Sequence, residues 1–462
     1  MRDGTATDRY PVDNGLRPIV IGAGWSGLSC AVQLARAGCH PIVLEAAPHV
    51  GGRARTVEVE LAGKRFRLDN GQHLLLGAYT RTLELMQTVG VAPSSVFSQA
   101  SFAVSYPDGW HLAAARLPAP WHLAVGIARA RKIPWAHRWA LARWVQKQRN
   151  HHWEVSADAP AATLFAGYPS ELTRRLWRPL CLAALNVDLE QASARIFLNV
   201  LRDSLGAREP ASRLLQPLVD LSALFPESAL RWLLGRGADV RLHCMVRQVR
   251  PLSDGDACRV ILRDGTSLTG PTVLAVPPER AAALLLEGAP TSLVSSVAAL
   301  SRLRPAPIST VYLRFATPMH LPRPFYALLD DATKQRYGQW VFDRGAYDRA
   351  LEGILSVVIS GHGPHMEHSR EALGRHVADQ LRLELGLPSP LEHFTIIEKH
   401  ATLIAAPGLQ RPAAALPAPG LFLAADSAQS PYPSTIEGSV RSGITAAQEL
   451  VRNLPERKLR LS

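Results

Sequence analysis

A glycine-rich turn near the start of the sequence, GAGWSG at residues 22–27, most constrains what this chain can fold into. An apolar run at residues 18–21 leads directly into the turn and suits a buried parallel strand. After the turn, apolar residues recur at helical spacing until Gly38, a residue type that favours the end of a helix. A second apolar run, at residues 42–44, ends in Glu45. The stretch predicts a complete strand–helix–strand unit of the Rossmann-like α/β class.

The spacing of these glycines predicts a nucleotide site. The first glycine permits the tight turn, the second lets the backbone approach a pyrophosphate, and the third permits close packing of helix on strand. The helix N-terminus offers free N–H groups and a positive dipole end to the phosphates, and the acidic residue can accept hydrogen bonds from ribose hydroxyls. The alternative is a glycine-rich turn in an ordinary α/β domain, and the unit alone does not separate FAD from NAD. The expected cofactor contacts here are Gly22, Gly24, Trp25, Ser26, Gly27 and Glu45.

A second turn, Gly51-Gly52-Arg53, follows six residues after Glu45. It can return the chain toward the pyrophosphate and bring a guanidinium near it. The arrangement Glu-x5-Gly-Gly-Arg resembles the flavin-containing amine oxidase and phytoene desaturase superfamily, in which it marks FAD. The resemblance therefore implies FAD as the cofactor, with Gly51, Gly52 and Arg53 among the residues that bind it.

Two later segments are similar to the same superfamily. Short β runs between residues 239 and 268 imply a return to the FAD domain, with a strand that passes the adenine near Val246. Near the C-terminus, a strand at residues 421–424 precedes Asp426 and a helix expected from about Ser434, whose dipole would face the flavin. No cysteine lies beyond Cys258, which excludes a C-terminal cysteinyl–flavin bond and makes non-covalent FAD the expectation. The implied contacts in these segments are Val246, Asp426, Thr435 and Ile436.

The length of 462 residues, at about 150 residues per domain, predicts two to three domains. We expect one interrupted Rossmann-like FAD-binding domain of the amine oxidase type with an inserted α+β substrate domain. The FAD-binding domain is expected at 16–100, 215–285 and 415–455, and the substrate domain at 101–214 and 286–414.

Further stretches resemble one subgroup, the squalene-associated FAD-dependent desaturases, which are hydroxysqualene dehydroxylases of bacterial hopanoid synthesis. This resemblance implies that hydroxysqualene loses its allylic hydroxyl and receives a hydride from reduced flavin N5, giving squalene. The alternatives are an oxidative carotenoid-type (phytoene-like) desaturase or amine oxidase of the same superfamily, and, in another class, a non-catalytic prenyl-binding protein. The sequence identifies no external electron donor. The stretches are 68–79, 177–205, 220–227, 338–345 and 435–443.

The segment Asp69-Asn70-Gly71-Gln72-His73 supplies the catalytic candidates. The superfamily brings this segment beside the isoalloxazine ring, and loss of hydroxide needs a proton donor, for which His73 and Asp69 are the candidates. In the alternative interpretation Asp69 caps a turn, while Gly71, Gln72 and His73 only contact the edges of the flavin.

The charge balance points to one region. The chain carries 51 basic and 39 acidic residues, a net charge of +12, and residues 118–149 hold four tryptophans and seven basic residues without one acid. Such a mixture suits helices that rest on an anionic membrane, and it equally suits a helix pair with a core-facing tryptophan stripe. A cytoplasmic protein, peripheral at the inner face of the cytoplasmic membrane, is the resulting expectation.

Several other segments could be taken for a targeting signal, a metal site or a second nucleotide site, and none is predicted to be one. The first fifteen residues are polar, lack an apolar targeting core, and are expected to form an unfolded leader. The histidines at 362, 365 and 368 are expected in a polar loop that enters a helix, so no metal site is predicted. No nucleic-acid motif is present. The run at 354–360 leading into Gly361-His362-Gly363 imitates a second nucleotide fingerprint but lacks its third glycine.

Overall fold

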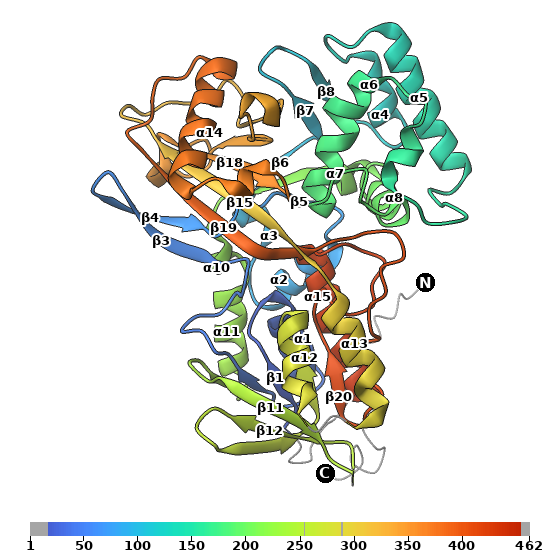
Figure 1. The fold of residues 1–462 in the computed structure, drawn as a ribbon, viewed down its shortest axis with the longest axis vertical. Coiled ribbons are helices and arrows are strands. Elements are labelled where there is room, and N and C mark those ends of the chain that lie inside the picture. The colour runs from blue at the N-terminus through green and yellow to red at the C-terminus, as the bar shows by residue number, and fades with distance from the viewer. Residues whose placement is uncertain (1–16, 254, 288–289, 454–462) are drawn as a thin grey trace, which may run out of the picture.

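The computed structural model describes residues 17–253, 255–287 and 290–453, arranged in two lobes joined at a waist (Figure 1). The expected leader at residues 1–15, and residues 16, 454 and 455 of the expected FAD-domain segments, lie outside the described residues. Within these described ranges, every helix is too short or too polar to cross a bilayer.

A five-stranded parallel sheet organises the lower lobe. Its strands are three residues long, and all but β10 are completely buried, as their apolar sequences predict. Because all five run parallel, their carboxyl ends meet at one edge, which faces the waist. The strand order is β10 (Asp239–Arg241), β2 (Ile42–Leu44), β1 (Ile19–Ile21), β14 (Thr272–Leu274) and β20 (Leu421–Leu423).

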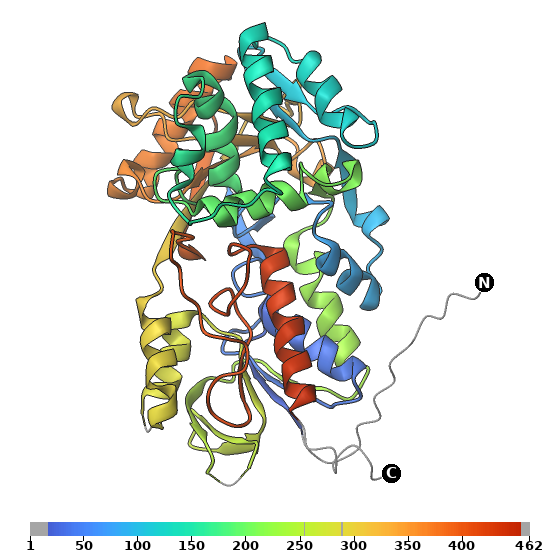
Figure 2. The ribbon, with the colours of Figure 1, turned by 90° about the vertical axis from the view of Figure 1, so that its right-hand side faces the viewer.

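Two helices pack against each other beside this sheet, α1 (Trp25–Arg36) and α15 (Ile436–Arg452) (Figure 2). α1 ends where the sequence predicts, with Gly38 at φ +85°. α15 begins two residues later than expected, because the Thr435 side chain caps it by accepting a hydrogen bond from Gly438 N–H at 3.1 Å. The other helices of this part are α2 (Thr80–Thr88), α3 (Pro93–Val96), α10 (Leu221–Leu224) and α11 (Pro226–Leu234).

Further layers complete the lower lobe. Of the β runs expected between residues 239 and 268, the first is β10 of the parallel sheet. The others form a three-stranded antiparallel sheet, whose apolar residues share one core with the neighbouring helices. The elements are β11 (Val246–Pro251), β12 (Cys258–Leu262), β13 (Ser267–Gly270), α12 (Pro278–Leu286) and α13 (Val294–Arg302).

A five-stranded antiparallel sheet occupies one side of the upper lobe, and its two longest strands run down to the waist (Figure 1). The run at 354–360 that imitates a nucleotide fingerprint is a strand of this sheet. His362, His365 and His368 lie in the loop and short 3₁₀ helix that lead into α14 (Arg370–Leu385). The strand order is β16 (Phe325–Ala327), β17 (Trp340–Asp343), β18 (Ile354–Ser360), β15 (Pro305–Arg314) and β19 (Glu392–Leu403).

Helices form the other side of the upper lobe around an aromatic core. Trp144, Phe165 and Trp177 contact one another: the ring centroid of Trp144 lies 5.3 Å from that of Phe165 and 4.2 Å from that of Trp177. The helices are α4 (Trp121–Ala128), α5 (Trp135–Asn150), α6 (Ser170–Leu172), α7 (Arg178–Leu185), α8 (Ala194–Asp203) and α9 (Glu209–Ser212). The small strands are β3 (Thr56–Leu61), β4 (Lys64–Asp69), β5 (Leu75–Leu76), β6 (Phe97–Ala100), β7 (Ala103–Ser105), β8 (His111–Ala113) and β9 (Leu214–Pro217).

Candidate active site

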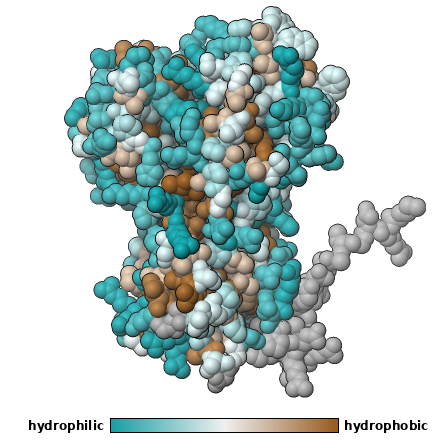
Figure 3. All heavy atoms as spheres, turned by 45° about the vertical axis from the view of Figure 1, so that its right-hand side comes forward, coloured by the Kyte–Doolittle hydropathy of each residue, from teal (hydrophilic) through white to brown (hydrophobic). Residues whose placement is uncertain are grey.

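A cavity of about 1140 Å³ is bounded by residues of both lobes, and hydrophobic side chains gather on the surface at the waist (Figure 3). Two of the predicted site residues, Gly27 and Asp69, are not in its lining. The structure brings all the other predicted residues to this one cavity. They are Gly22, Gly24, Trp25, Ser26, Glu45, Gly51, Gly52, Arg53, Gly71, Gln72, His73, Val246, Asp426, Thr435 and Ile436.

The two glycine turns nearly touch. Gly22 has φ +104°, and a Cβ there would lie 2.4 Å from the carbonyl oxygen of Ala275. A Cβ on Gly52 would lie 3.0 Å from the Cα of Gly24. Gly27 acts inside the unit, since a Cβ there would meet the Gly22 carbonyl oxygen at 1.9 Å. Only a glycine at position 27 lets α1 pack this closely on the turn after β1. In this position the N-terminal residues of the helix, Trp25 and Ser26, line the cavity.

Glu45 lies at the carboxyl end of β2. One of its carboxylate oxygens accepts a hydrogen bond from the N–H of Ala23 at 2.6 Å, and the other accepts one from Ala47 at 2.8 Å. These bonds fix the carboxylate at the cavity and leave further lone pairs for hydroxyl groups. Val246 is 4% exposed at the start of β11, and its carbonyl accepts a hydrogen bond from Arg280 at 2.5 Å.

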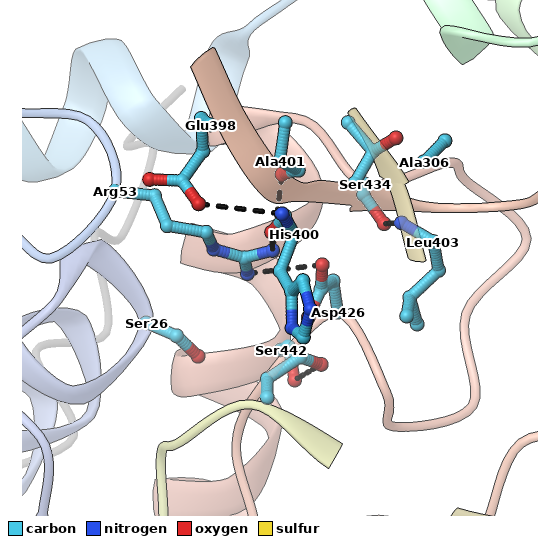
Figure 4. Close-up of polar contacts among 12 residues, drawn as sticks. Ser26, Arg53, Ala306, Glu398, His400, Ala401, Leu403, Asp426, Ser434 and Ser442 are labelled. Carbon is cyan, nitrogen blue, oxygen red and sulfur yellow. Dashed lines mark hydrogen bonds and ion pairs between the residues drawn. The ribbon is translucent and has the colours of Figure 1, made fainter. Parts of the chain in front are cut away.

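Arg53 forms an ion pair with Asp426, at 3.0 Å between Nη2 and Oδ2 (Figure 4). Its Nη1 donates to the carbonyl oxygens of His400 and Ala401 in β19, at 3.1 and 3.0 Å. Burial opposes the charge, but the carboxylate of Asp426 raises the pKa of Arg53 overall. The side chain of Asp426 is 1% exposed, and its Oδ1 has no partner among the described residues. A buried acceptor of this kind fits a ligand that brings a hydroxyl donor.

Asp69 lies behind the cavity wall. Its carboxylate accepts hydrogen bonds from the N–H of Leu221 at 2.9 Å and from Arg344 at 3.3 Å. The hydroxyl of Tyr312 donates to the Asp69 main-chain oxygen at 2.8 Å. Burial raises the pKa of Asp69, and the charge of Arg344 opposes this shift. The geometry therefore gives Asp69 a role in holding the cavity wall.

His73 and Gln72 reach the cavity itself. The Nδ1–H of His73 donates to the carbonyl oxygen of Gly71 at 2.8 Å, and burial lowers the pKa of His73. Burial therefore favours the neutral imidazole, in which Nε2 is the acceptor. The side-chain oxygen of Gln72 accepts a hydrogen bond from Arg344. Arg344 joins Gln72 to Asp69, a role that residue type alone did not indicate, although it lies within the stretch 338–345.

The N-terminus of α15 also lines the cavity. Glu437 anchors this turn, because its carboxylate accepts hydrogen bonds from the N–H and hydroxyl of Thr82 at 2.9 and 2.7 Å. Thr435 and Ile436 precede it on the cavity wall.

Sequence reasoning missed a cluster beside this helix. The hydroxyl of Tyr432 donates to Asp203 at 2.7 Å, and both residues line the cavity. Arg411 donates to the main-chain oxygens of Asp426 and Tyr432 at 3.1 and 3.0 Å and so shapes the loop between them. No periodicity or motif marks Arg411 and Tyr432, because the loops that hold them have no regular structure, and nothing local indicates that Asp203, at the end of α8, meets Tyr432.

The upper part of the cavity is apolar. Aliphatic and aromatic side chains from α7, α8 and the antiparallel sheet line it, which suits a long hydrocarbon. They include Phe102, Leu180, Leu182, Phe197, Val200, Leu201, Phe325, Trp340, Phe342 and Val358. Among the described residues, no group of histidine, cysteine, aspartate and glutamate side chains could hold a metal ion.

The residues present fit FAD. The open N-terminus of α1, with the uncapped Gly24 before it, offers donors to a pyrophosphate. Glu45 offers acceptors to a ribose, and the unpartnered Oδ1 of Asp426 offers one to a ribityl hydroxyl.

Solved structures share the fold. An oxidoreductase from Methanosarcina mazei matches with a TM-score of 0.71 at 14% identity, covering 94% of this chain and all of that chain (100%). Cyclohexylamine oxidase from Brevibacterium oxydans matches with a TM-score of 0.65 at 17% identity, covering 96% of this chain and 99% of that chain.

Sequence comparison shows the family. Residues 25–451 match the model described as flavin containing amine oxidoreductase. Hydroxysqualene dehydroxylases of Sinorhizobium fredii and Rhodopseudomonas palustris are 32% and 31% identical, each over 93% of this chain and 96% of that protein. The 15-cis-phytoene desaturase of Solanum lycopersicum is 21% identical, over 95% of this chain and 78% of that protein. The expected fold class, family and cofactor are confirmed: the chain belongs to the flavin containing amine oxidoreductase family, with hydroxysqualene dehydroxylases among its relatives, and is an FAD-dependent oxidoreductase.

Proposed function

We propose that this enzyme reductively removes the hydroxyl group of hydroxysqualene and releases squalene. The observation that carries the proposal is the single cavity with a polar nucleotide-binding end and a continuous apolar end. The names of the two most similar relatives described above support the substrate. A C30 hydrocarbon needs a long apolar site, and the upper lobe offers one.

The reaction breaks the allylic C–O bond, forms a C–H bond at the allylic system, and releases the oxygen as water after one proton is added. Bound reduced FAD supplies the hydride, that is, the two electrons of the reduction. The apolar wall excludes water from the reacting carbon, and it holds the substrate chain in a fixed position.

The geometry does not suit either predicted proton donor, His73 or Asp69, to that role. His73 already donates from Nδ1 to Gly71, so in its neutral form Nε2 can accept a hydrogen bond but cannot donate one. Asp69 does not line the cavity. We therefore propose that His73 and Asp69 position the wall beside the cofactor, and that neither protonates the leaving hydroxide.

Two His73 variants test this assignment. H73A and H73Q should retain FAD and keep turnover within about tenfold of the parent enzyme, because positioning is lost but no proton donor is removed. Product formation per bound flavin is the measurement. A loss of about 10²–10⁴-fold in both variants, with FAD still bound, would assign His73 the acid role after all.

The proposed function is tested by an anaerobic single-turnover experiment. Chemically reduced enzyme is mixed with hydroxysqualene, and products are identified by mass spectrometry while flavin absorbance is followed. We expect squalene together with reoxidation of the flavin, and no product from oxidised enzyme. Reduction of oxidised flavin by substrate alone would instead support an oxidative desaturase.

A further inference from the structure

The hairpin of α4 and α5, residues 118–150, carries an unusual set of exposed side chains. Three of the ten tryptophans of the chain are exposed in the described structure, and all three lie on this hairpin. Trp121, Trp135 and Trp139 are 63%, 65% and 64% exposed. Exposed tryptophans in this number are uncommon on a surface that contacts only water. They indicate a partner.

The core of the hairpin does not need these three residues. Trp144, on the same helix, is 5% exposed and supplies the aromatic contacts with Phe165 and Trp177. Trp135 and Trp139 are one turn apart and therefore share a face of α5. The guanidinium of Arg138 lies 4.5 Å from the Trp135 ring centroid, which joins a cation to this aromatic face.

The same hairpin is strongly basic. Residues 118–149 include seven arginines and lysines and no aspartate or glutamate. In the described part of the chain, none of these seven basic side chains takes part in an ion pair. Arg143 and Lys147 follow Trp135 and Trp139 at four-residue spacing, so the exposed side of α5 changes from indole rings to cations along its length.

A small apolar cavity of about 30 Å³ lies beneath the hairpin. One side is formed by residues of α4 and α5, among them Leu123 and Leu141. The other side includes Phe102, Leu201 and Leu205, which also line the large cavity. Apolar side chains therefore form a continuous seam from the underside of the hairpin to the hydrocarbon end of the active site.

We propose that the α4–α5 hairpin docks on an anionic phospholipid bilayer, and that the isoprenoid enters the active site through the apolar seam beneath it. Indole rings settle at the level of lipid headgroups, and arginine and lysine are attracted to anionic lipid while their stems cover apolar surface. The docking surface stands on its own observations, whereas the entry route rests on the proposed function. The hairpin forms the outer corner of the upper lobe, where a flat bilayer can reach it (Figure 1).

Vesicle co-sedimentation of the FAD-loaded enzyme tests the docking surface. Vesicles of phosphatidylcholine with phosphatidylglycerol should bind the enzyme at low salt, and binding should fall at least tenfold at high salt or on pure phosphatidylcholine. The variant W121S/W135S/W139S should lose at least tenfold in binding. The matched control L383S/L391S removes two exposed leucines, 65% and 57% exposed, from elsewhere on the surface and should bind as the parent does.

Several results would overturn docking. One is absence of vesicle binding at low salt, and another is binding by the triple variant that equals that of the parent. A third is a change from dimer to monomer in the triple variant, which would show that the three tryptophans form a contact between copies of the chain. Tight tRNA binding that depends on the same tryptophans, with no vesicle binding, would identify a nucleic-acid surface. Flavin absorbance per protein checks that each variant keeps its fold.

The entry route has a separate readout. With hydroxysqualene embedded in vesicles, the triple variant should turn over at least tenfold more slowly than the parent, and with substrate in detergent micelles the two should be equal. Equal rates in vesicles would overturn the route. Absence of turnover by the parent in both media would instead contradict the proposed function and leave the vesicle-binding result intact.

Discussion

At the scale of single residues, the ion pair between Arg53 and Asp426 makes the sharpest prediction. Replacing Arg53 with methionine leaves a buried carboxylate without its partner. Loss of one partner of a fully buried pair costs about 3–5 kcal/mol, and because the Arg53 side chain is 33% exposed we expect roughly 1–3 kcal/mol. R53M should therefore unfold at lower urea concentration and retain less FAD, measured as flavin absorbance per protein.

The matched control for this pair is the double variant R53M/D426N. If the cost arises from the unpaired charge, neutralising Asp426 should restore part of the stability that R53M loses. If R53M and the double variant had equal free energies of unfolding, the unpaired charge of Asp426 would not be the cause of the lost stability. FAD retention should stay low in both, because each lacks Arg53, which lines the cavity that we expect to hold the cofactor.

His365 carries a prediction about pH. It is 4% exposed, and burial together with the nearby His362 and His368 lowers the pKa of His365 to about 4. Below pH 6.5 the unfolded chain binds a proton that folded His365 does not, so this residue makes stability fall as the pH drops from 6.5 to about 4. In H365F, the urea midpoint should therefore change less with pH over this range than it does in the parent. H151Q, at the end of α5, is the control and should behave as the parent does. An unchanged pH slope would contradict the assignment.

The residues that sequence analysis found are those with a local pattern. The glycines at 22, 24 and 27 act within one turn and one helix, so their spacing alone predicts their place. The family resemblance names Asp69 as a proton-donor candidate, but no local pattern predicts its contacts, because its partners, Leu221 and Arg344, are 152 and 275 residues away. Nothing in the residue types indicates that a fold brings these side chains together behind the cavity wall.

At the scale of elements, Gly443 determines how closely α15 approaches α1. A Cβ at this position would lie 2.2 Å from the main-chain oxygen of Ser26. G443V should separate the helices and cost about 1–3 kcal/mol or more, with loss of FAD, because both helices begin at the cavity. T445V, at an exposed position on the same helix, is the control. Retention of FAD and stability in G443V would show that the helices can separate without disturbing the site.

Element boundaries follow from sequence where a cap is visible. The apolar period and Gly38 predict both ends of α1 closely. α15 begins later than expected from its sequence because the Ser434 hydroxyl is occupied in a hydrogen bond from Leu403 N–H at 3.0 Å, which leaves Thr435 as the cap. Leu403 ends a strand of the other lobe, so this boundary depends on a contact that periodicity cannot reveal.

At the scale of the whole molecule, the sequence predicts that strands and helices form an α/β fold, but it does not predict the order of the strands in the sheet. The parallel sheet takes strands from the start, the middle and the end of the chain, and their order places β10 beside β2 and β14 beside β1. Three-residue strands carry too little pattern to specify their neighbours. The prediction of which segments form the FAD-binding domain therefore rests on the resemblance to a known superfamily, because strand propensity alone could not give it.

The position of the cavity predicts how FAD affects stability. Residues of both lobes line it, and Arg53 in the lower part bonds to His400 and Ala401 of β19, a strand of the upper sheet. A ligand that binds only the folded state stabilises it by about 2.7 kcal/mol at 100 times its Kd. FAD added to deflavinated enzyme should therefore raise the unfolding temperature of the whole molecule by several degrees, seen by calorimetry as one transition that moves to higher temperature. Riboflavin, which lacks the pyrophosphate and adenosine, should cause little change at equal concentration. Two transitions, of which FAD moves only one, would show that the lobes unfold separately and that the contacts of Arg53 across the waist do not couple them.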